Sequence, residues 1–172
     1  MLKELFSEIT IKRRVKEIAN SINSDYHGKV PLLIGILKGS FIFFSDLIRE
    51  IKIDCEIDFM KVSSYRGSQS KGSVNLESNF SIDVRGRDVI IVEDVIDSGL
   101  TINYLINLLN ESDPSSVVVA SLLFKNEVAQ LNSKPKYICF ETSQDYVVGY
   151  GLDYNQKMRN LKSIKVLDKL DK

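Results

Sequence analysis

The sequence contains no tryptophan, one histidine, two cysteines and three prolines in 172 residues. His27 stands alone and Cys55 and Cys139 lie far apart inside apolar segments, so a zinc site is not expected and a disulfide scaffold is excluded. We expect both thiols to be reduced, as in a cytoplasmic protein. No apolar run approaches the ~18–20 residues of a transmembrane helix. The first residues also lack the apolar stretch of a secretion signal.

An excess of charge of either sign is lacking as well. The 23 Lys and Arg residues balance 23 Asp and Glu residues. A neutral chain offers no dominant surface for nucleic acid or an anionic membrane, so neither is an expected partner. With 44% hydrophobic residues, the chain is long enough to form one domain with its own core. We therefore expect a single domain over residues 1–172.

Apolar runs alternate with helical patterns along the chain. The spacing of apolar residues predicts helices near 11–22, 41–51 and 100–109, and strands near 30–37, 55–59, 89–92, 117–124 and 137–140. This alternation is typical of βαβ units, so the expected fold class is α/β with a central, mostly parallel sheet flanked by helices. The segment 63–73 is rich in Ser and Gly and is either a mobile functional loop or a hairpin tip.

The richest group of polar residues follows the strand expected at 89–92. Residues 93–101 read Glu-Asp-Val-Ile-Asp-Ser-Gly-Leu-Thr and lead into the next helix. In sheets of this class, ligands bind beyond the carboxyl ends of the strands. Free N–H groups at the helix N-terminus suit a phosphate, as do the hydroxyls of Ser98 and Thr101. The acids suit ribose hydroxyls or hydrated Mg²⁺. A capped helix after solvated acids is the simpler alternative, which three acids ahead of Ser-Gly-x-Thr disfavour.

The segment 89–101 resembles the phosphoribosyl-diphosphate-binding signature of type I phosphoribosyltransferases. Further stretches in the expected order narrow the resemblance to bacterial hypoxanthine (hypoxanthine-guanine) phosphoribosyltransferases; they are residues 37–40, 62–65, 121–125 and 145–155. The likeness runs from about residue 5 to 167. It implies the type I fold, with a core at about 9–145, a small hood from about 1–8 and 146–172, and a mobile lid loop at about 63–75.

The resemblance implies a purine salvage enzyme. Such enzymes transfer 5-phosphoribosyl from phosphoribosyl diphosphate to N9 of hypoxanthine or guanine, giving IMP or GMP and diphosphate. Mg²⁺ is the implied cofactor, and a homodimer or homotetramer is the implied assembly. Two alternatives remain open: a relative that prefers xanthine, and a nucleotide-sensing, RNA-binding regulator on the same fold. The basic residues within 12–16 and 157–172 keep the second alternative open.

Two residues receive chemical roles from the resemblance. Asp97 takes the position of the general base that removes the purine N7 proton, a role that contributes roughly 10²–10⁴ in rate. Taken alone, Asp97 is explained as a helix N-cap, an alternative that the surrounding motifs disfavour. Lys125 matches the lysine that donates to the purine O6. An ammonium there favours a carbonyl and disfavours the amino group of adenine.

The other positions are assigned to substrate, metal and lid. Binding of phosphoribosyl diphosphate is assigned to Lys38, Gly39, Glu93, Asp94, Asp97, Ser98, Gly99, Leu100, Thr101 and Arg159. Binding of the purine is assigned to Lys125, Tyr146, Val147 and Asp153. Mg²⁺ is assigned to Glu93, Asp94 and Asp153, and the lid begins at Ser64 and Tyr65. One departure is Leu100, where some relatives carry lysine; we interpret it as a mark of subtype.

Overall fold

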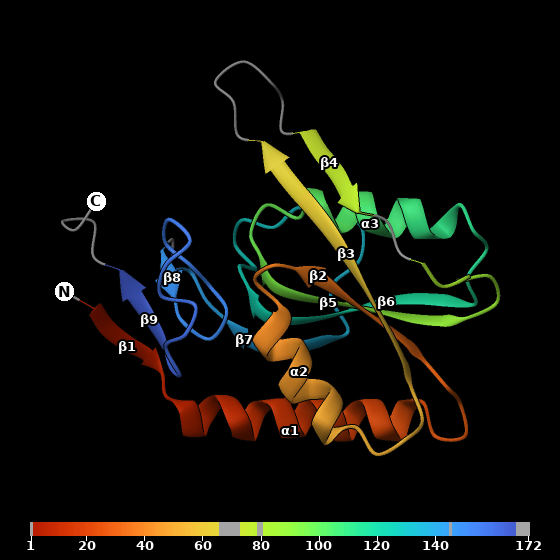
Figure 1. The fold of residues 1–172 in the computed structure, drawn as a ribbon, viewed down its shortest axis with the longest axis horizontal. Coiled ribbons are helices and arrows are strands. Elements are labelled where there is room, and N and C mark those ends of the chain that lie inside the picture. Colours follow the sequence, from red (N-terminus) through yellow and green to blue (C-terminus); the bar gives the residue numbers. More distant parts are fainter. Residues whose placement is uncertain (1, 66–72, 79–80, 145, 168–172) are drawn as a thin grey trace.

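The computed structural model describes residues 2–65, 73–78, 81–144 and 146–167. A six-stranded sheet has the order β4-β3-β2-β5-β6-β7, and a three-stranded sheet has the order β1-β9-β8 (Figure 1). The strands of the larger sheet are β2 (Leu32–Leu37), β3 (Glu56–Tyr65), β4 (Ser73–Ser78), β5 (Asp88–Ile96), β6 (Ser116–Phe124) and β7 (Tyr137–Glu141). Those of the smaller sheet are β1 (Leu2–Phe6), β8 (Val147–Val148) and β9 (Ile164–Leu167), and the helices are α1 (Glu8–Asp25), α2 (Phe41–Glu50) and α3 (Leu100–Asn110).

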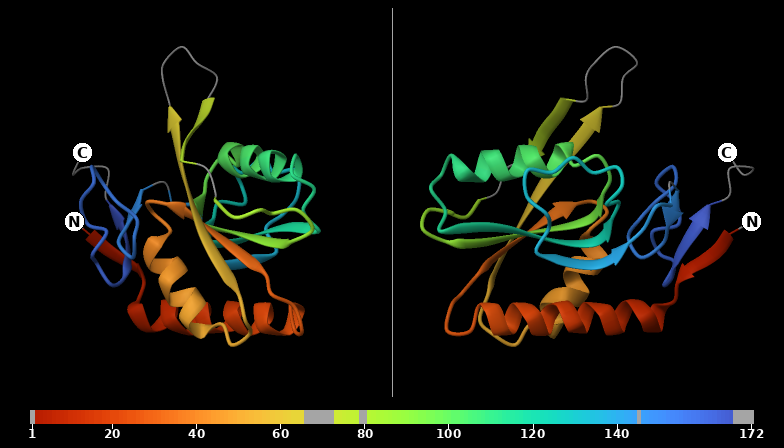
Figure 2. Two further views of the ribbon diagram at one scale, coloured as in Figure 1. Left: turned by 45° about the vertical axis from the view of Figure 1, so that its right-hand side comes forward. Right: turned by 180° about the vertical axis from the view of Figure 1, so that it is seen from behind.

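The larger sheet is parallel except for β4, which pairs antiparallel with β3. Helices α1 and α2 cover one face of this sheet and α3 covers the other, while the smaller sheet lies to one side (Figures 1 and 2). The expected α/β class with a mostly parallel sheet is therefore confirmed. No helix in the described part of the chain is long and apolar enough to cross a bilayer.

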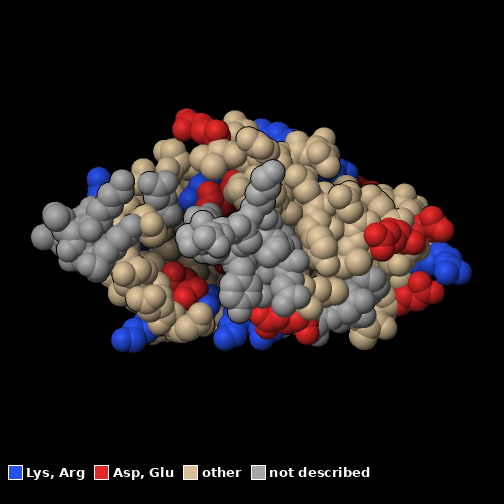
Figure 3. Space-filling model, turned by 90° about the horizontal axis from the view of Figure 1, so that it is seen from above, with Lys and Arg blue, Asp and Glu red and all other residues tan. Residues whose placement is uncertain are grey.

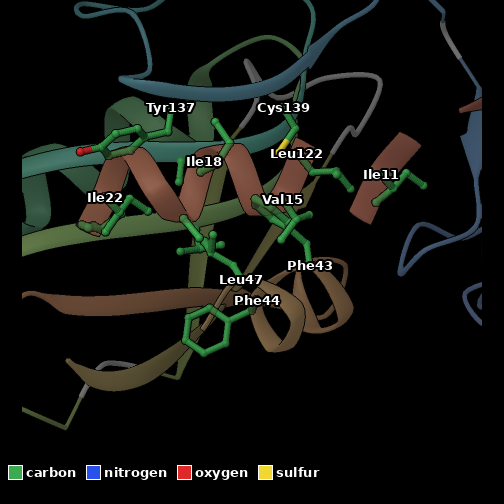
Figure 4. Close-up of a cluster of buried hydrophobic side chains, with 14 of the residues drawn as sticks. Ile11, Val15, Ile18, Ile22, Phe43, Phe44, Leu47, Leu122, Tyr137 and Cys139 are labelled. Atoms are coloured by element: carbon green, nitrogen blue, oxygen red, sulfur yellow. The ribbon is translucent and has the colours of Figure 1, made fainter. Parts of the chain in front are cut away.

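A buried cluster joins α1 and α2 to the sheet. Apolar residues of α1 recur on one face and point toward α2 and the strands (Figure 4). The labelled members of the cluster are Ile11, Val15, Ile18, Ile22, Phe43, Phe44, Leu47, Leu122, Tyr137 and Cys139. Ser7 caps the start of α1, because its Oγ accepts a hydrogen bond from the Thr10 N–H. A second apolar cluster fills the space between α3 and the opposite face of the sheet.

The chain reverses its direction of travel across the sheet between β2 and β5. From β2 it proceeds to β3 and β4 on one side, and from β5 to β6 and β7 on the other. The carboxyl ends of β2 and β5 therefore flank a topological switch point, the place where open α/β sheets bind ligands.

The structure extends the predicted elements and adds others. Strand β3 continues beyond residue 59, where the predicted strand ended. The strands of the smaller sheet and β4 were not predicted, because their sequences are short or alternate only weakly between apolar and polar residues. Of the predicted lid at 63–75, residues 66–72 lie outside the described residues, and the flanking residues belong to β3 and β4. Both cysteines are free; Cys139 is buried as expected, but Cys55 is only half-buried.

Candidate active site

A cavity of about 770 Å³ opens at the switch point between β2 and β5. It is lined by the end of β2, the end of β5 with the start of α3, and the loop that follows β8. Seen from above, acidic and basic side chains lie next to one another on this face of the molecule (Figure 3). The residues predicted from sequence that line it are Lys38, Gly39, Glu93, Asp94, Asp97, Ser98, Gly99, Leu100, Thr101, Asp153 and Arg159.

The start of α3 forms the part of the cavity suited to a phosphate. Gly99 is the N-cap and has a left-handed φ of 86°. It packs against Gln130 and Leu131 so closely that a Cβ at this position would lie 2.9 Å from the Gln130 carbonyl oxygen. The alternative in which Asp97 is the cap is therefore wrong. The only side-chain contact to these first N–H groups in the described residues is a long one, from the Leu100 N–H to Ser98 Oγ at 3.4 Å, so the N–H groups and the dipole of this helix end remain available to an anion in the cavity.

Two adjacent acids at the end of β5 differ in burial. Glu93 is buried, with 7% of its surface exposed, whereas Asp94 is half-buried. Burial, reinforced by the neighbouring Asp94 carboxylate, raises the pKa of Glu93 well above its ordinary value. Asp94 Oδ1 accepts a hydrogen bond from the Val95 N–H at 2.9 Å, which orients that carboxylate.

The loop after β2 packs directly against Asp94. A Cβ on Gly39 would collide with the Asp94 carboxylate, so this position tolerates no side chain in the observed arrangement. The Leu37–Lys38 peptide is cis. Ser40 is fully buried and donates from its Oγ to the Ile36 carbonyl at 2.6 Å, which closes the loop before α2 begins.

The loop after β8 contributes an arginine held by three acceptors. Arg159 Nη2 lies 2.7 Å from Asp153 Oδ1 and donates to Gln156 Oε1 at 3.2 Å. Its Nη1 donates to the Gly151 carbonyl at 2.8 Å. Only 19% of the Arg159 side chain is exposed, so the guanidinium is held in one orientation at the wall of the cavity.

Lys125 follows β6 and is not among the residues that line the cavity, but it contacts Asp97, which is. Its Nζ lies 3.3 Å from Asp97 Oδ1, with 7% of the lysine side chain and 34% of the aspartate side chain exposed. Backbone bonds fix this juxtaposition, since the Lys125 N–H donates to the Ile96 carbonyl at 3.0 Å. The structure therefore brings the predicted base and the predicted purine lysine together.

Other predicted residues do not line the cavity. Tyr146 is 41% exposed, and Val147 is a half-buried residue of β8 that pairs with Val166. Ser64 and Tyr65 lie in β3, where their backbones pair with β4. Sequence reasoning missed Gln156, which lines the cavity beside Asp153; its place directly after the Asp153-Tyr154-Asn155 stretch was the available signal.

The acids of the cavity suit Mg²⁺ better than a metal held entirely by protein. No group of three or more His, Cys, Asp or Glu side chains arranged for a metal occurs among the residues described by the structure. Mg²⁺ commonly uses one or two carboxylates and takes its other ligands from substrate and water. Asp94 and Asp153 at the cavity wall fit that pattern.

Comparison with known proteins agrees with this geometry. The family model for the phosphoribosyl transferase domain matches residues 1–155. A hypoxanthine-guanine phosphoribosyltransferase of Bacillus subtilis is 43% identical over 166 residues, which is 96% of this chain and 92% of the relative. A Streptococcus pneumoniae protein of the same name is 42% identical over the same shares.

Solved structures give the same result. One is the crystal structure of a hypoxanthine-guanine phosphoribosyltransferase from Bacillus anthracis with HEPES in its active site. It superposes on this chain with a TM-score of 0.92 and is 38% identical in sequence, and the match covers 98% of this chain and 100% of that one. A Trypanosoma cruzi hypoxanthine phosphoribosyltransferase in complex with its product IMP superposes with a TM-score of 0.89 at 34% identity, covering 98% and 91%.

Proposed function

Because the chain belongs to the phosphoribosyltransferase family, we propose that it catalyses the salvage of 6-oxopurines. The reaction transfers 5-phosphoribosyl from phosphoribosyl diphosphate to N9 of hypoxanthine or guanine. The C1′–diphosphate bond breaks, the N9–C1′ bond forms, and the products are IMP or GMP with diphosphate. The observation that carries the proposal is the convergence on one cavity of the α3 N-terminus, the acids of β5 and Asp97, which pairs with Lys125 behind it.

The start of α3 is the proposed site of the 5′-phosphate. Its backbone N–H groups and the hydroxyls of Ser98 and Thr101 donate to an anion, and Gly99 allows the close approach of the backbone. Leu100 is half-exposed and adds no charge, so its backbone is the contributing part. Glu93 and Asp94 are proposed to accept hydrogen bonds from the ribose hydroxyls.

The purine is proposed to lie beside Lys125 and Asp97. Lys125 donates to O6, and Asp97 accepts the N7 proton as N9 attacks the ribose. Tyr146, whose ring is partly exposed, offers an aromatic face for stacking, and Val147 and Asp153 bind the purine edge through backbone groups. Purine preference follows from Lys125, because its ammonium donates to a carbonyl O6 but faces another donor when O6 is replaced by an amino group.

The leaving diphosphate is proposed to lie between the Lys38–Gly39 loop and Arg159. The loop offers backbone N–H groups and Arg159 offers a guanidinium, which matches phosphate geometry. Asp94, Asp153 and Glu93 are the proposed protein ligands of Mg²⁺, and Glu93 is the buried member of the three. When bound, Mg²⁺ neutralises the charge that develops on the diphosphate.

The proposed reaction also assigns roles to the smaller sheet and to the segment 63–75. The smaller sheet is the proposed hood over the large sheet, and the segment 63–75 is the proposed lid that excludes water during the transfer. Two free cysteines suit a reducing compartment, so we place the enzyme in the cytoplasm.

Assembly into a homodimer is proposed from an apolar patch on α2 and β3. Phe41, Ile57 and Phe59 are 44%, 42% and 37% exposed. Phe59 contacts Phe44 of α2, with ring centroids 4.8 Å apart, so the patch continues from the helix onto the strand. Exposed apolar patches of this kind mark interaction surfaces, and a twofold interface would bury this one against the same patch of a second copy.

The test of the proposed function is the formation of IMP. The protein is mixed with hypoxanthine, phosphoribosyl diphosphate and Mg²⁺, and the products are separated by chromatography. We expect IMP and diphosphate in equal amounts and loss of both after chelation of the metal. Absence of IMP with all three reactants present contradicts the proposal.

A further inference from the structure

Tyr150 occupies an unusual turn between β8 and the loop that carries Arg159. It adopts a positive φ of 51° between two glycines with φ of 95° and 100°. Its side chain is 5% exposed and belongs to the core cluster shared with α1 and α2. Its hydroxyl donates to Asp46 Oδ2 of α2 at 2.8 Å, so the turn is tied to the helix across the core.

The same turn contacts both sides of the proposed diphosphate site. Gly151 lies so close to the loop after β2 that a Cβ there would collide with the Gly39 carbonyl oxygen. On its other side, the Gly151 carbonyl accepts from Arg159 Nη1, and the Gly151 N–H donates to the Arg159 carbonyl at 3.0 Å. The residue next to Tyr150 therefore fixes the spacing between Gly39 and Arg159.

The hydrogen bond between Tyr150 and Asp46 is well suited to hold this turn. Burial, and then the Asp46 carboxylate, raises the pKa of the Tyr150 hydroxyl, so it stays protonated as a donor. Asp46 also pairs with Arg49 of the same helix, but the Arg49 side chain is 73% exposed, so this ion pair adds little. A bond from a buried hydroxyl to a charged acceptor is among the stronger classes of side-chain contact.

We propose that Tyr150 is a positioning residue for the leaving group: its hydrogen bond to Asp46 fixes the turn 149–151 against α2 and thereby sets the Lys38–Gly39 loop opposite Arg159. The proposal rests on the assignment of the diphosphate site above. Tyr150 does not line the cavity, so its effect passes through the backbone of the turn, by the contacts of Gly151 and by the bond from the Tyr150 N–H to the Leu161 carbonyl at 2.7 Å.

A matched control exists at the start of the edge strand β7. Tyr137, also buried, donates to Asp25 Oδ2 at 2.7 Å, and it stands at the start of β7. Figure 4 shows Tyr137 beside the Ile22 end of α1, away from the Ile11 end. Tyr137→Phe therefore breaks a comparable tyrosine–aspartate bond in the same core without touching the cavity.

The experiment compares Tyr150→Phe, Tyr137→Phe and the parent protein by calorimetric titration with two probes. Inorganic diphosphate with Mg²⁺ reports the leaving-group side, and IMP reports the phosphate loop and the purine side, which the proposed scheme places apart from the Lys38–Gly39 loop and Arg159. We expect Tyr150→Phe to weaken diphosphate binding about fivefold to tenfold, the effect of losing one hydrogen bond, while IMP binding changes less than about twofold. Tyr137→Phe should leave both affinities unchanged while lowering the melting temperature.

Variants of Asp46, which accepts the hydrogen bond, test whether Tyr150 influences diphosphate binding through this bond. Asp46→Asn keeps an acceptor oxygen and should retain most of the diphosphate affinity, whereas Asp46→Ala should reproduce the defect of Tyr150→Phe. The double variant Tyr150→Phe/Asp46→Ala should then be no weaker than either single variant.

Three results would overturn the role of Tyr150: unchanged diphosphate binding in Tyr150→Phe, an equal loss of IMP binding, or the same loss of diphosphate binding in Tyr137→Phe. Failure of the proposed function is distinguishable from all three, because the parent protein would then form no IMP.

Discussion

Lys125 Nζ lies 3.3 Å from Asp97 Oδ1, at the point where the ends of β5 and β6 meet the start of α3. The lysine is almost completely buried, and the aspartate is partly open to the cavity. In the absence of a purine, the two side chains pair with each other. A 6-oxopurine offers O6 to the lysine and its N7 proton to the aspartate, so it replaces this pairing at both ends.

Replacement of Asp97 by asparagine should abolish proton acceptance without removing the side chain. We expect Asp97→Asn to lower turnover at least a hundredfold, within the ~10²–10⁴ range of general base catalysis. Binding of phosphoribosyl diphosphate, measured by titration calorimetry, should stay close to that of the parent. Asp54→Asn, an exposed aspartate before β3, is the matched control and should keep full activity. Near-normal turnover in Asp97→Asn would remove Asp97 as the base.

Removal of the Lys125 ammonium should relax the choice of purine. We expect Lys125→Ala to reduce the preference for hypoxanthine over adenine by roughly 10- to 100-fold, mainly through loss of hypoxanthine use. The ratio of kcat/KM for the two bases is the quantity to measure. Lys134→Ala removes an exposed lysine paired with Glu141 and should leave the ratio unchanged. A ratio that also stays constant in Lys125→Ala would refute the assignment of Lys125 to O6.

Addition of a methyl group at Gly39 should impair substrate binding more than it lowers the stability of the fold. The new Cβ meets the Asp94 carboxylate, so either the loop or the acid must move. We expect Gly39→Ala to raise the KM for phosphoribosyl diphosphate at least tenfold. Gly86→Ala is the informative contrast: its Cβ meets nothing within 4 Å, but its φ of 67° is unfavourable for alanine. That variant should lose about 1 kcal/mol of stability and keep its KM. Equal KM values in the two variants would contradict the close packing of Gly39 on Asp94.

Asp88 should make stability depend on pH at the acidic end. The Ser116 hydroxyl and then the Lys29 ammonium hold the pKa of Asp88 below its ordinary value of 3.8. The charged form is therefore favoured by folding, and its contribution is complete above about pH 4 and disappears as the pH falls through the lower folded pKa.

Urea unfolding of Asp88→Asn measures this contribution. The variant should be about 1 kcal/mol less stable than the parent at pH 7, and the difference should shrink below about pH 4. The exposed Asp54→Asn control should show no such change. A difference between Asp88→Asn and the parent that is constant from pH 7 to pH 3 would contradict the role of the carboxylate.

The sequence predicted the parts of the site that are local in the chain. The segment from Glu93 to Thr101 contains a strand end, the proposed phosphate loop and a helix start, and each is specified by neighbouring residues. The helices also followed from apolar spacing, because each buries one face against the sheet, and the central strands followed from continuous apolar runs, because both of their faces are buried.

The rest of the site depends on contacts between distant segments. The ion pair of Asp97 with Lys125 and the contact of Gly151 with Gly39 join residues far apart in the chain, and no periodic pattern encodes them. Strand β8 has two residues and β1 has a weakly alternating sequence, so both are defined by pairing with β9 rather than by their own composition. Tyr150 looks like an ordinary aromatic residue in the sequence, and its role emerges only from its bond to Asp46.

The most direct test of the account is diphosphate release in the presence of phosphoribosyl diphosphate and Mg²⁺, with hypoxanthine, guanine, xanthine and adenine supplied separately. The account predicts release with hypoxanthine and guanine, weak release with xanthine and none with adenine. Release with adenine equal to that with hypoxanthine would contradict the role of Lys125. No release with any of the four bases would contradict the assignment of the cavity to purine salvage.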